Sequence, residues 1–137
     1  MGCHVGCVVP TASQDLLAAT ADGFLRVNPI NGARTLLHHP EAHCLDNRFN
    51  DGKCDPWGRL WAGSMHYEFV PGAAALWRLD TNLESRRMRS DVTISNGLAW
   101  SSDRRFLYFI DSPTLQVLRL PLCLLYTSDA ADDTPCV

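Results

Sequence analysis

Residues 47–65 read Asn47-Arg48-Phe49-Asn50-Asp51-Gly52-Lys53-Cys54-Asp55-Pro56-Trp57-Gly58-Arg59-Leu60-Trp61-Ala62-Gly63-Ser64-Met65. Four polar side chains in this stretch stand directly before a turn and an apolar strand: Arg48, Asn50, Asp51 and Lys53. A turn needs Gly, Asn or Asp for its backbone angles. It does not need an arginine and a lysine as well, so the excess of polar groups predicts a site beside the strand.

Short apolar runs bounded by turn residues continue on both sides of this stretch. They predict strands at Leu16–Thr20, Phe24–Val27, Ala33–Leu37, Leu60–Met65, Ala75–Leu79 and Phe106–Ile110. No segment shows the sustained apolar stripe of an amphipathic helix. The pattern therefore predicts an all-β fold.

A weak internal repeat runs through the chain. Gly58-Arg59-Leu60-Trp61 aligns with Arg104-Arg105-Phe106-Leu107, 46 positions later. A second repeat consists of three similar tripeptides: Leu25-Arg26-Val27, Trp77-Arg78-Leu79 and Leu118-Arg119-Leu120. Four-stranded units that recur at roughly 40–50 residues are typical of propeller blades. A blade cannot bury both of its faces alone, so each one needs a neighbour on either side.

Two long motifs carry a family resemblance. The stretch Asn47–Met65 resembles a signature of the regucalcin/gluconolactonase family, which includes senescence-marker proteins and luciferin-regenerating enzymes. Ile94-Ser95-Asn96-Gly97-Leu98-Ala99-Trp100-Ser101, with residues 107–112 after it, resembles that family's next signature. The resemblance runs roughly from Gly6 to Leu120 and implies a six-bladed propeller. We therefore expect a β-propeller fragment of about three four-stranded blades in residues 1–120.

The pattern of the family stops after Leu120. Residues 121–137 shift to small and acidic residues with no strand alternation. We expect a tail that is either non-native, like a translated adapter, or a genuine flexible terminus. Neither alternative assigns the tail a function.

The candidate site is rich in oxygen ligands. Asn50, Asp51, Glu68 and Asn96 offer the hard oxygen atoms that calcium, magnesium and manganese prefer. Three of these residues also have simpler readings. Asn96 before Gly97 is compatible with a turn, and Asn50-Asp51-Gly52 is by itself a hairpin signal. Asp51 either orients a ligand or serves a turn, and Asp111 either lines the channel or ends a strand.

The resemblance assigns roles to four residues. It implies that Asn96 binds a divalent metal, with calcium as the first expectation and zinc, magnesium or manganese as alternatives. It implies that Arg48 and Asn50 contact a sugar lactone. Glu68 falls three residues after Met65, at the spacing of a substrate-contacting glutamate, although its neighbours His66 and Tyr67 depart from the family's usual small or acidic residues.

Two family elements have no counterpart in the chain. The family's metal is also held by a glutamate near the start of the first blade and by an aspartate beyond the second signature. The aspartate is thought to act in catalysis, so we expect no catalytic residue here. These expectations describe a fragment of a metal-dependent sugar-lactone hydrolase that is inactive as this truncated chain. The alternative is a calcium-binding regulatory propeller without turnover.

The composition of the chain limits the classes of molecule that it is expected to bind. The chain has 137 residues and a net charge of -3, which argues against binding to nucleic acid. Its one dense basic patch, Arg86-Arg87-Met88-Arg89, is short, and we expect it to be a solvated loop or strand edge. No apolar run approaches the roughly 20 residues that span a bilayer, and no secretory signal is visible. We expect a cytoplasmic protein that binds a small sugar lactone rather than nucleic acid or membrane. The sequence leaves the oligomeric state open.

Overall fold

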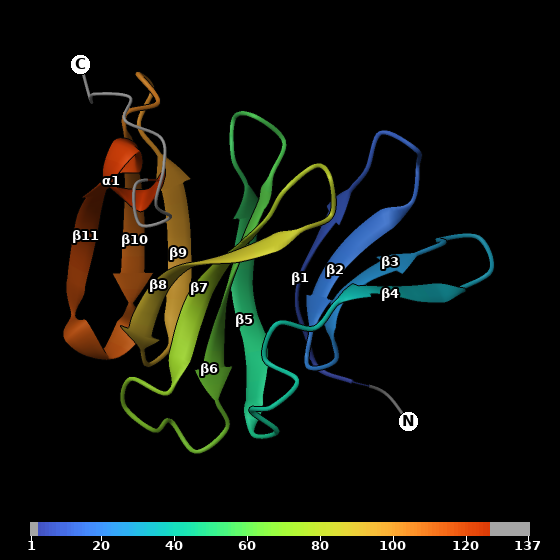
Figure 1. The fold of residues 1–137 in the computed structure, drawn as a ribbon, viewed down its shortest axis with the longest axis horizontal. Helices are drawn as coiled ribbons and strands as arrows, with labels where there is room; N and C mark the ends of the chain where they lie inside the picture. Colours follow the sequence, from blue (N-terminus) through green and yellow to red (C-terminus); the bar gives the residue numbers. More distant parts are fainter. Residues whose placement is uncertain (1–2, 127–137) are drawn as a thin grey trace.

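Three antiparallel sheets stand side by side in the computed structural model, which describes residues 3–126 (Figure 1). Blade 1 consists of β1 (Val5–Pro10), β2 (Leu16–Thr20), β3 (Gly23–Val27) and β4 (Arg34–His38). Blade 2 consists of β5 (Asn47–Cys54), β6 (Leu60–His66), β7 (Ala74–Leu79) and β8 (Ser85–Val92). Blade 3 consists of β9 (Ser95–Trp100), β10 (Phe106–Asp111) and β11 (Gln116–Pro121). The 3-10 turn η1 (Ser112–Thr114) joins β10 to β11, and the short helix α1 (Leu122–Tyr126) follows.

Each blade is a meander in which consecutive strands pair. The first strands of the blades, β1, β5 and β9, lie next to one another, with β5 between the other two (Figure 1). An isolated bridge from Met65 to Ile94 adds a backbone link between blades 2 and 3. The polar residues of β5 and β9 are therefore brought to one region of the molecule.

The core lies in two layers between the blades. Between blades 1 and 2 pack Ala19, Phe24, Phe49, Leu60, Ala62 and Leu79. Between blades 2 and 3 pack Trp61, Ala74, Leu76, Val92, Leu98, Leu107, Phe109 and Leu122. Strand β6 serves both layers because successive side chains of a strand point to opposite faces. Its buried run from Leu60 to Met65 is the apolar run that the sequence shows.

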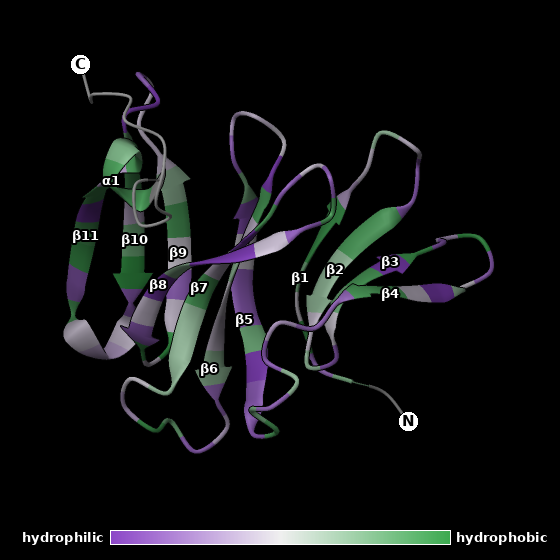
Figure 2. Cartoon of the chain, viewed as in Figure 1, coloured by the Kyte–Doolittle hydropathy of each residue, from purple (hydrophilic) through white to green (hydrophobic). Residues whose placement is uncertain are grey.

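Hydropathy differs from strand to strand. In Figure 2, β2 is coloured mainly as hydrophobic, whereas β8 is coloured mainly as hydrophilic. Strand β8 is the outermost strand of blade 2, and Arg86 and Arg87 on it are exposed. An outer strand with charged side chains discourages pairing with another sheet edge.

The repeat in the sequence corresponds to one hairpin used in every blade. The hairpin between the first two strands places a residue with positive φ at its tip: Gln14, Gly58 and Arg104. The backbone N–H of each of these residues donates to the carbonyl three residues earlier, on Thr11, Asp55 and Ser101. The second repeat, the three similar tripeptides, lies on the third strand of each blade, β3, β7 and β11. Both predicted repeats are therefore confirmed.

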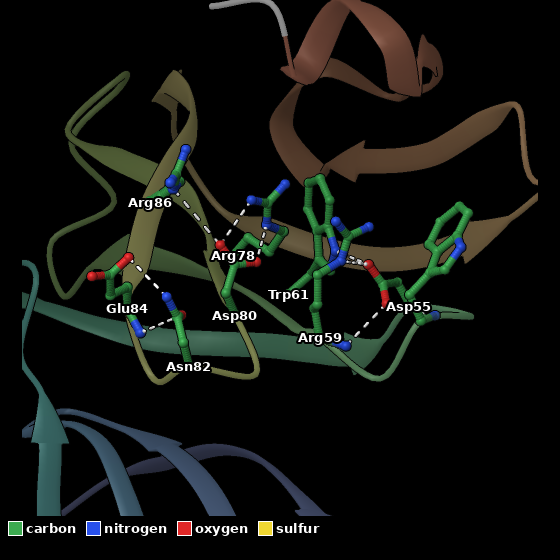
Figure 3. A network of polar contacts seen from close by, with 9 residues as sticks. Asp55, Arg59, Trp61, Arg78, Asp80, Asn82, Glu84 and Arg86 are labelled. Carbon is green, nitrogen blue, oxygen red and sulfur yellow. Dashed lines mark hydrogen bonds and ion pairs between the residues drawn. The ribbon is translucent and has the colours of Figure 1, made fainter. Parts of the chain in front are cut away.

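The hairpin of blade 2 is held by one buried carboxylate. Asp55 Oδ1 accepts the backbone N–H groups of Trp57 and Arg59 at 2.9 and 3.0 Å. Asp55 Oδ2 accepts Arg59 Nε at 2.6 Å and the indole Nε1 of Trp61 at 2.9 Å. Figure 3 shows Trp61 between Asp55 and Arg78. Because an indole N–H needs a partner when it is buried, Asp55 allows Trp61 to enter the core.

The structure confirms one expectation and refines another. Residues 47–54 form a strand of their own, β5, and the turn after it leads into the apolar strand β6, so the polar cluster does stand before a turn and an apolar strand. The third blade has three strands in residues 3–126 where four were expected. After Pro121 the chain turns into α1, and Leu122 is buried in the layer between blades 2 and 3. The rest of the predicted tail, residues 127–137, lies outside the described residues.

Candidate functional site

Two β-bulges face each other on neighbouring inner strands. Asn50 is the extra residue of β5, because Phe49 pairs with Ser64 and Asp51 with Gly63. Gly97 is the extra residue of β9, because Asn96 pairs with Ile110 and Leu98 with Phe109. A bulge interrupts the alternation of side chains. Asn50 and Asp51 can therefore both reach β9, although they are consecutive.

The two side chains hold the backbone of β9 on both sides of Asn96. Asn50 Nδ2 donates to the carbonyl oxygen of Ser95 at 2.8 Å. Asp51 Oδ2 accepts the backbone N–H of Gly97 at 2.8 Å, and Asp51 Oδ1 accepts that of Gly52 at 2.8 Å. Asn50-Asp51-Gly52 therefore forms no hairpin, and Asn96-Gly97 lies within a strand. Both turn alternatives are excluded for these residues.

Arg48 is hydrogen-bonded to Asn50. Its Nη1 donates to Asn50 Oδ1 and to the carbonyl oxygen of Phe49, each at 3.1 Å. The guanidinium carbon also lies 5.8 Å from the ring centre of Tyr67. Arg48 is half-buried, so part of its charge faces solvent. A continuous chain of contacts thus runs from Tyr67 through Arg48 and Asn50 to the backbone of β9.

Asn96 is exposed and oriented by blade 3. Its Nδ2 donates to Ser112 Oγ at 3.2 Å, which turns the amide so that Oδ1 is the atom available to a ligand. The segment before Asn96 is tied to the end of β10, because the buried Asp111 accepts the backbone N–H groups of Thr93 and Ile94 at 3.0 and 2.8 Å. Asp111 therefore fixes the backbone at the end of its strand.

Glu68 lies in the exposed turn after β6. The pairing of Asn47 with His66 places this turn at the end of blade 2 where β5 begins, close to Arg48 in the sheet. The backbone N–H of Glu68 donates to His66 Nδ1 at 3.0 Å. Within the described residues, the Glu68 side chain makes no hydrogen bond to Arg48, Asn50 or Asn96. The structure brings together the other three predicted site residues and leaves Glu68 at the rim.

The residues described here do not by themselves fit a divalent cation. Within residues 3–126, no three His, Cys, Asp or Glu side chains form a group that could hold a metal ion. Both carboxylate oxygens of Asp51 and of Asp111 accept backbone N–H groups. Asn96 offers one neutral amide oxygen, whereas calcium takes about six to eight oxygen ligands.

Two polar groups near the site were not predicted from the sequence. Glu41 is buried and accepts from Asn47 Nδ2, Ser64 Oγ and Trp77 Nε1 at 3.0, 2.8 and 2.7 Å. No motif surrounds Glu41, so the sequence carried no signal for it. The second group is the pair of Tyr67 and His4, whose Oη and Nδ1 atoms lie 2.9 Å apart. The signal for this pair was the departure of Tyr67 from the family pattern.

Comparison with known proteins identifies the family. Residues 1–124 match the SMP-30/Gluconolactonase/LRE-like region. The chain belongs to the SMP-30/gluconolactonase/LRE-like family. The predicted resemblance to this family is therefore confirmed.

Relatives in this family include proteins named as lactonases and as regucalcins. The chain is 43% identical to human regucalcin over 122 residues, which is 85% of this chain and 41% of that protein. It is 43% identical over 76 residues to the 6-deoxy-6-sulfogluconolactonase of Pseudomonas putida, which is 56% of this chain and 26% of that protein.

A solved structure supports the same fold. The calcium-binding protein regucalcin from Agrobacterium tumefaciens superposes with a TM-score of 0.80 and 26% identity, over 85% of this chain and 39% of that one. The prediction of propeller blades is therefore confirmed. The chain spans about two fifths of the length of the human and Agrobacterium regucalcins that it matches. Within residues 3–126, no helix is long and apolar enough to cross a membrane.

Proposed function

We propose that this chain supplies the substrate-binding part of a sugar-lactone hydrolase. The observation that carries the proposal is the hydrogen-bonded line from Arg48 through Asn50 to Ser95, which joins the two family signatures on β5 and β9. A lactone presents a carbonyl, a ring oxygen and several hydroxyls. A site for it needs fixed donors and acceptors on a rigid support, and adjacent inner strands of a propeller provide one.

Each predicted residue has a role that its geometry permits. The guanidinium of Arg48 carries further N–H donors besides the Nη1 group that bonds Asn50, and these donors suit lactone oxygen atoms. The Oδ1 of Asn50 has a second lone pair that can accept a substrate hydroxyl. The exposed carboxylate of Glu68 at the rim can accept hydroxyls that lie further from the β-bulges. Binding at several fixed points orients a substrate for attack.

Metal dependence is part of the proposal. Asn96 would supply one oxygen ligand through its Oδ1, with calcium as the first candidate and zinc, magnesium or manganese as alternatives. The remaining ligands and the catalytic carboxylate would come from residues other than those described here. Asp51 and Asn50 support this role because they fix the backbone on both sides of Asn96.

A calcium-binding protein without turnover is the second candidate. The regucalcin of Agrobacterium, whose fold the chain shares, is described as a calcium-binding protein. The same orientation of Asn96 by Ser112 would serve a bound calcium ion equally well. Activity measurements distinguish the two candidates.

A chimera tests the enzymatic proposal. Strands β1–β11 of this chain would replace the segment of the Pseudomonas 6-deoxy-6-sulfogluconolactonase that contains the 76 aligned residues. Hydrolysis of D-glucono-1,5-lactone and of the host's own substrate would be followed by proton release. We expect lactone hydrolysis that a chelator abolishes. A folded chimera that binds calcium but hydrolyses neither lactone would favour the second candidate and contradict the first.

The 137-residue chain on its own should not hydrolyse D-glucono-1,5-lactone above the spontaneous rate in the presence of calcium, because one amide oxygen cannot retain the ion against water. The measurement is proton release with and without protein. Chelator-sensitive turnover by the chain would overturn this expectation.

A further inference from the structure

Tyr67 is an exposed aromatic residue held from three sides. Its backbone N–H donates to the carbonyl of Asp46 at 2.8 Å, which anchors it to the connection between blades 1 and 2. Its hydroxyl lies 2.9 Å from His4 Nδ1, just before β1. Its ring lies 5.8 Å from the Arg48 guanidinium carbon. The residue thus contacts blade 1, the connection before β5 and β5 itself.

These contacts fix the ring without burying it. Tyr67 is 37% exposed, although both its backbone and its hydroxyl are held. The imidazole of His4 packs against it at 5.3 Å between ring centres with a tilt of 57°. A ring that is fixed in this way keeps aromatic surface in solvent at little further cost in conformational entropy. Preorganised aromatic surfaces of this kind favour ligand binding.

The position of the ring selects the ligand. It stands beside Arg48, which also donates to Asn50, so a molecule bound to these polar groups would meet the phenol ring next. The electron-rich face of an aromatic ring attracts groups with partial positive charge. The axial C–H groups on one face of a pyranose-like ring have this character. An extended open-chain sugar acid presents no comparable flat face.

We propose that Tyr67 is a specificity-determining residue of the site, and that it favours cyclic sugars by packing against the C–H face of their ring. His4 is the positioning residue that fixes its tilt. This inference rests on the proposed function, because it takes the ligand at Arg48 and Asn50 to be a sugar lactone. It adds that the cyclic lactone is held more tightly than the open-chain acid formed from it.

The test is a nuclear magnetic resonance titration of the full 137-residue chain. The two probes are methyl β-D-glucopyranoside, which is cyclic, and D-gluconate, which is open-chain. The signals to follow are the Arg48 Nε–H and the Asn50 side-chain amide. We expect Tyr67→Ala to weaken binding of the cyclic probe at least about fivefold and that of gluconate less than about twofold. Tyr67→Phe, which keeps the ring, should bind the cyclic probe within about threefold of the original chain.

Tyr108→Ala is the matched control, since Tyr108 is also 37% exposed but lies on β10 of blade 3. It should leave the affinity for both probes unchanged. Amide spectra of Tyr67→Ala report whether blades 1 and 2 keep their structure. If that variant unfolds, the comparison of Tyr67→Phe with Tyr67→Leu replaces it, because leucine retains bulk without a π face.

The possible outcomes separate the two proposals. Equal loss of both probes in a folded Tyr67→Ala, or no loss of either, overturns the role of Tyr67. If Arg48→Ala abolishes binding of both probes in the same experiment, the proposed substrate site stands. If neither probe shifts the Arg48 and Asn50 signals of the unchanged chain, the inference and the proposed substrate site both fail.

Discussion

The carboxylate of Asp51 accepts hydrogen bonds from two blades. One oxygen accepts Gly52 N–H on its own strand, and the other accepts Gly97 N–H on β9. Gly97 has φ of +49°, and a Cβ there would lie 2.9 Å from Ile110 Cδ1. Glycine is favoured where the strand bulges toward Asp51, because L side chains rarely adopt this positive φ. The geometry beside Asn96 depends on this pair of residues.

Asp51→Asn should destabilise the chain by about 1–3 kcal/mol, because an amide has only one acceptor atom and one of the two N–H groups would face the NH₂ group. Urea unfolding measures the loss, and amide hydrogen exchange at Gly52 and Gly97 shows which bond is lost. Asp22→Asn, in the exposed turn after β2, is the control and should cost less than about 0.5 kcal/mol. Equal effects of the two substitutions would contradict this role of Asp51.

Cys7 gives the chain a pH dependence at the alkaline end. Burial, with a smaller contribution from the nearby charge of Asp51, raises the pKa of the Cys7 thiol from 9.0 to about 11. The folded state therefore prefers the protonated thiol. Its contribution to stability is complete below pH 9 and is lost as the pH rises toward 11, by at most about 3 kcal/mol.

The expected result is a wild-type unfolding free energy that falls between pH 9 and pH 11 relative to that of Cys7→Ser, whose hydroxyl does not titrate there. Chemical denaturation at a series of pH values measures both proteins. Parallel curves over this window would show that the thiol of Cys7 ionises as easily in the folded state as in the unfolded chain.

At the scale of elements, each blade is organised by the hairpin between its first two strands. In blade 2 that hairpin depends on Asp55, which is buried and accepts four hydrogen bonds (Figure 3). A second carboxylate supports the hairpin between β7 and β8. Asp80 bonds Arg78 through both oxygens at 2.6 and 2.9 Å. In both hairpins, an aspartate accepts hydrogen bonds from an arginine at or next to the end of a neighbouring strand.

Asp55→Ala should cost about 2–4 kcal/mol, since it leaves the buried indole N–H of Trp61 and two backbone N–H groups without acceptors. Thermal and urea unfolding measure the change, and tryptophan fluorescence reports the environment of Trp61. Asp80→Ala is the comparison, and we expect a smaller effect because Asp80 is partly exposed. A larger loss from Asp80→Ala would show that the hairpin of β7 and β8, not that of β5 and β6, limits the stability of blade 2.

The sequence predicts six strands, and five of them carry buried apolar residues. The sixth, predicted at Ala33–Leu37, corresponds to β4, which is mostly exposed. Strands β2, β3, β6, β7 and β10 carry continuous or alternating apolar residues, and the structure places them within a residue or so of the expected bounds. The sequence pattern did not predict strands β5 and β9, because each contains a bulge and polar residues. It did not predict strand β8 either, because Arg86 and Arg87 on this strand face solvent. Periodicity detects side chains that alternate between core and water, and these three strands do not alternate.

The candidate site was found by a different route. Two motifs identified the family, one containing Arg48 and Asn50 and the other containing Asn96, whereas the local sequence alone was also compatible with turns at Asn50 and Asn96. What no motif could supply was the three-dimensional grouping: the opposed bulges, the anchoring of Tyr67 by His4, and the use of both Asp51 oxygens between strands. These features depend on how β1, β5 and β9 pack against one another, and a motif within one strand does not encode that packing.

At the scale of the whole molecule, the blades approach one another closely through glycines. A Cβ added to Gly63 on β6 would lie 1.7 Å from Ser95 Oγ on β9, and one added to Gly6 on β1 would lie 2.6 Å from the Phe49 backbone on β5. Neither glycine has a positive φ. Their absence of a side chain therefore sets the distance between blades.

Gly63→Ala should destabilise the chain by about 2–4 kcal/mol through this clash. Adding Ser95→Gly should recover much of the loss, and a double-mutant cycle measures the coupling. Gly32→Ala, where no atom lies within 4 Å of the added Cβ, is the control and should cost about 1 kcal/mol from its positive φ alone. Additive effects of the substitutions at Gly63 and Ser95 would mean that the two blades are not in contact there.

The proposed function depends above all on the line from Arg48 through Asn50 to β9, which we propose holds a sugar lactone. Its sharpest test is kcat/KM for D-glucono-1,5-lactone in the Pseudomonas chimera, with Arg48→Ala compared with Arg26→Ala, an exposed arginine on β3. We expect Arg48→Ala to lower kcat/KM at least about 100-fold, because several substrate contacts depend on that guanidinium. Arg26→Ala should change it less than about twofold. A folded Arg48→Ala chimera that keeps the kcat/KM of the unchanged chimera would contradict the proposal.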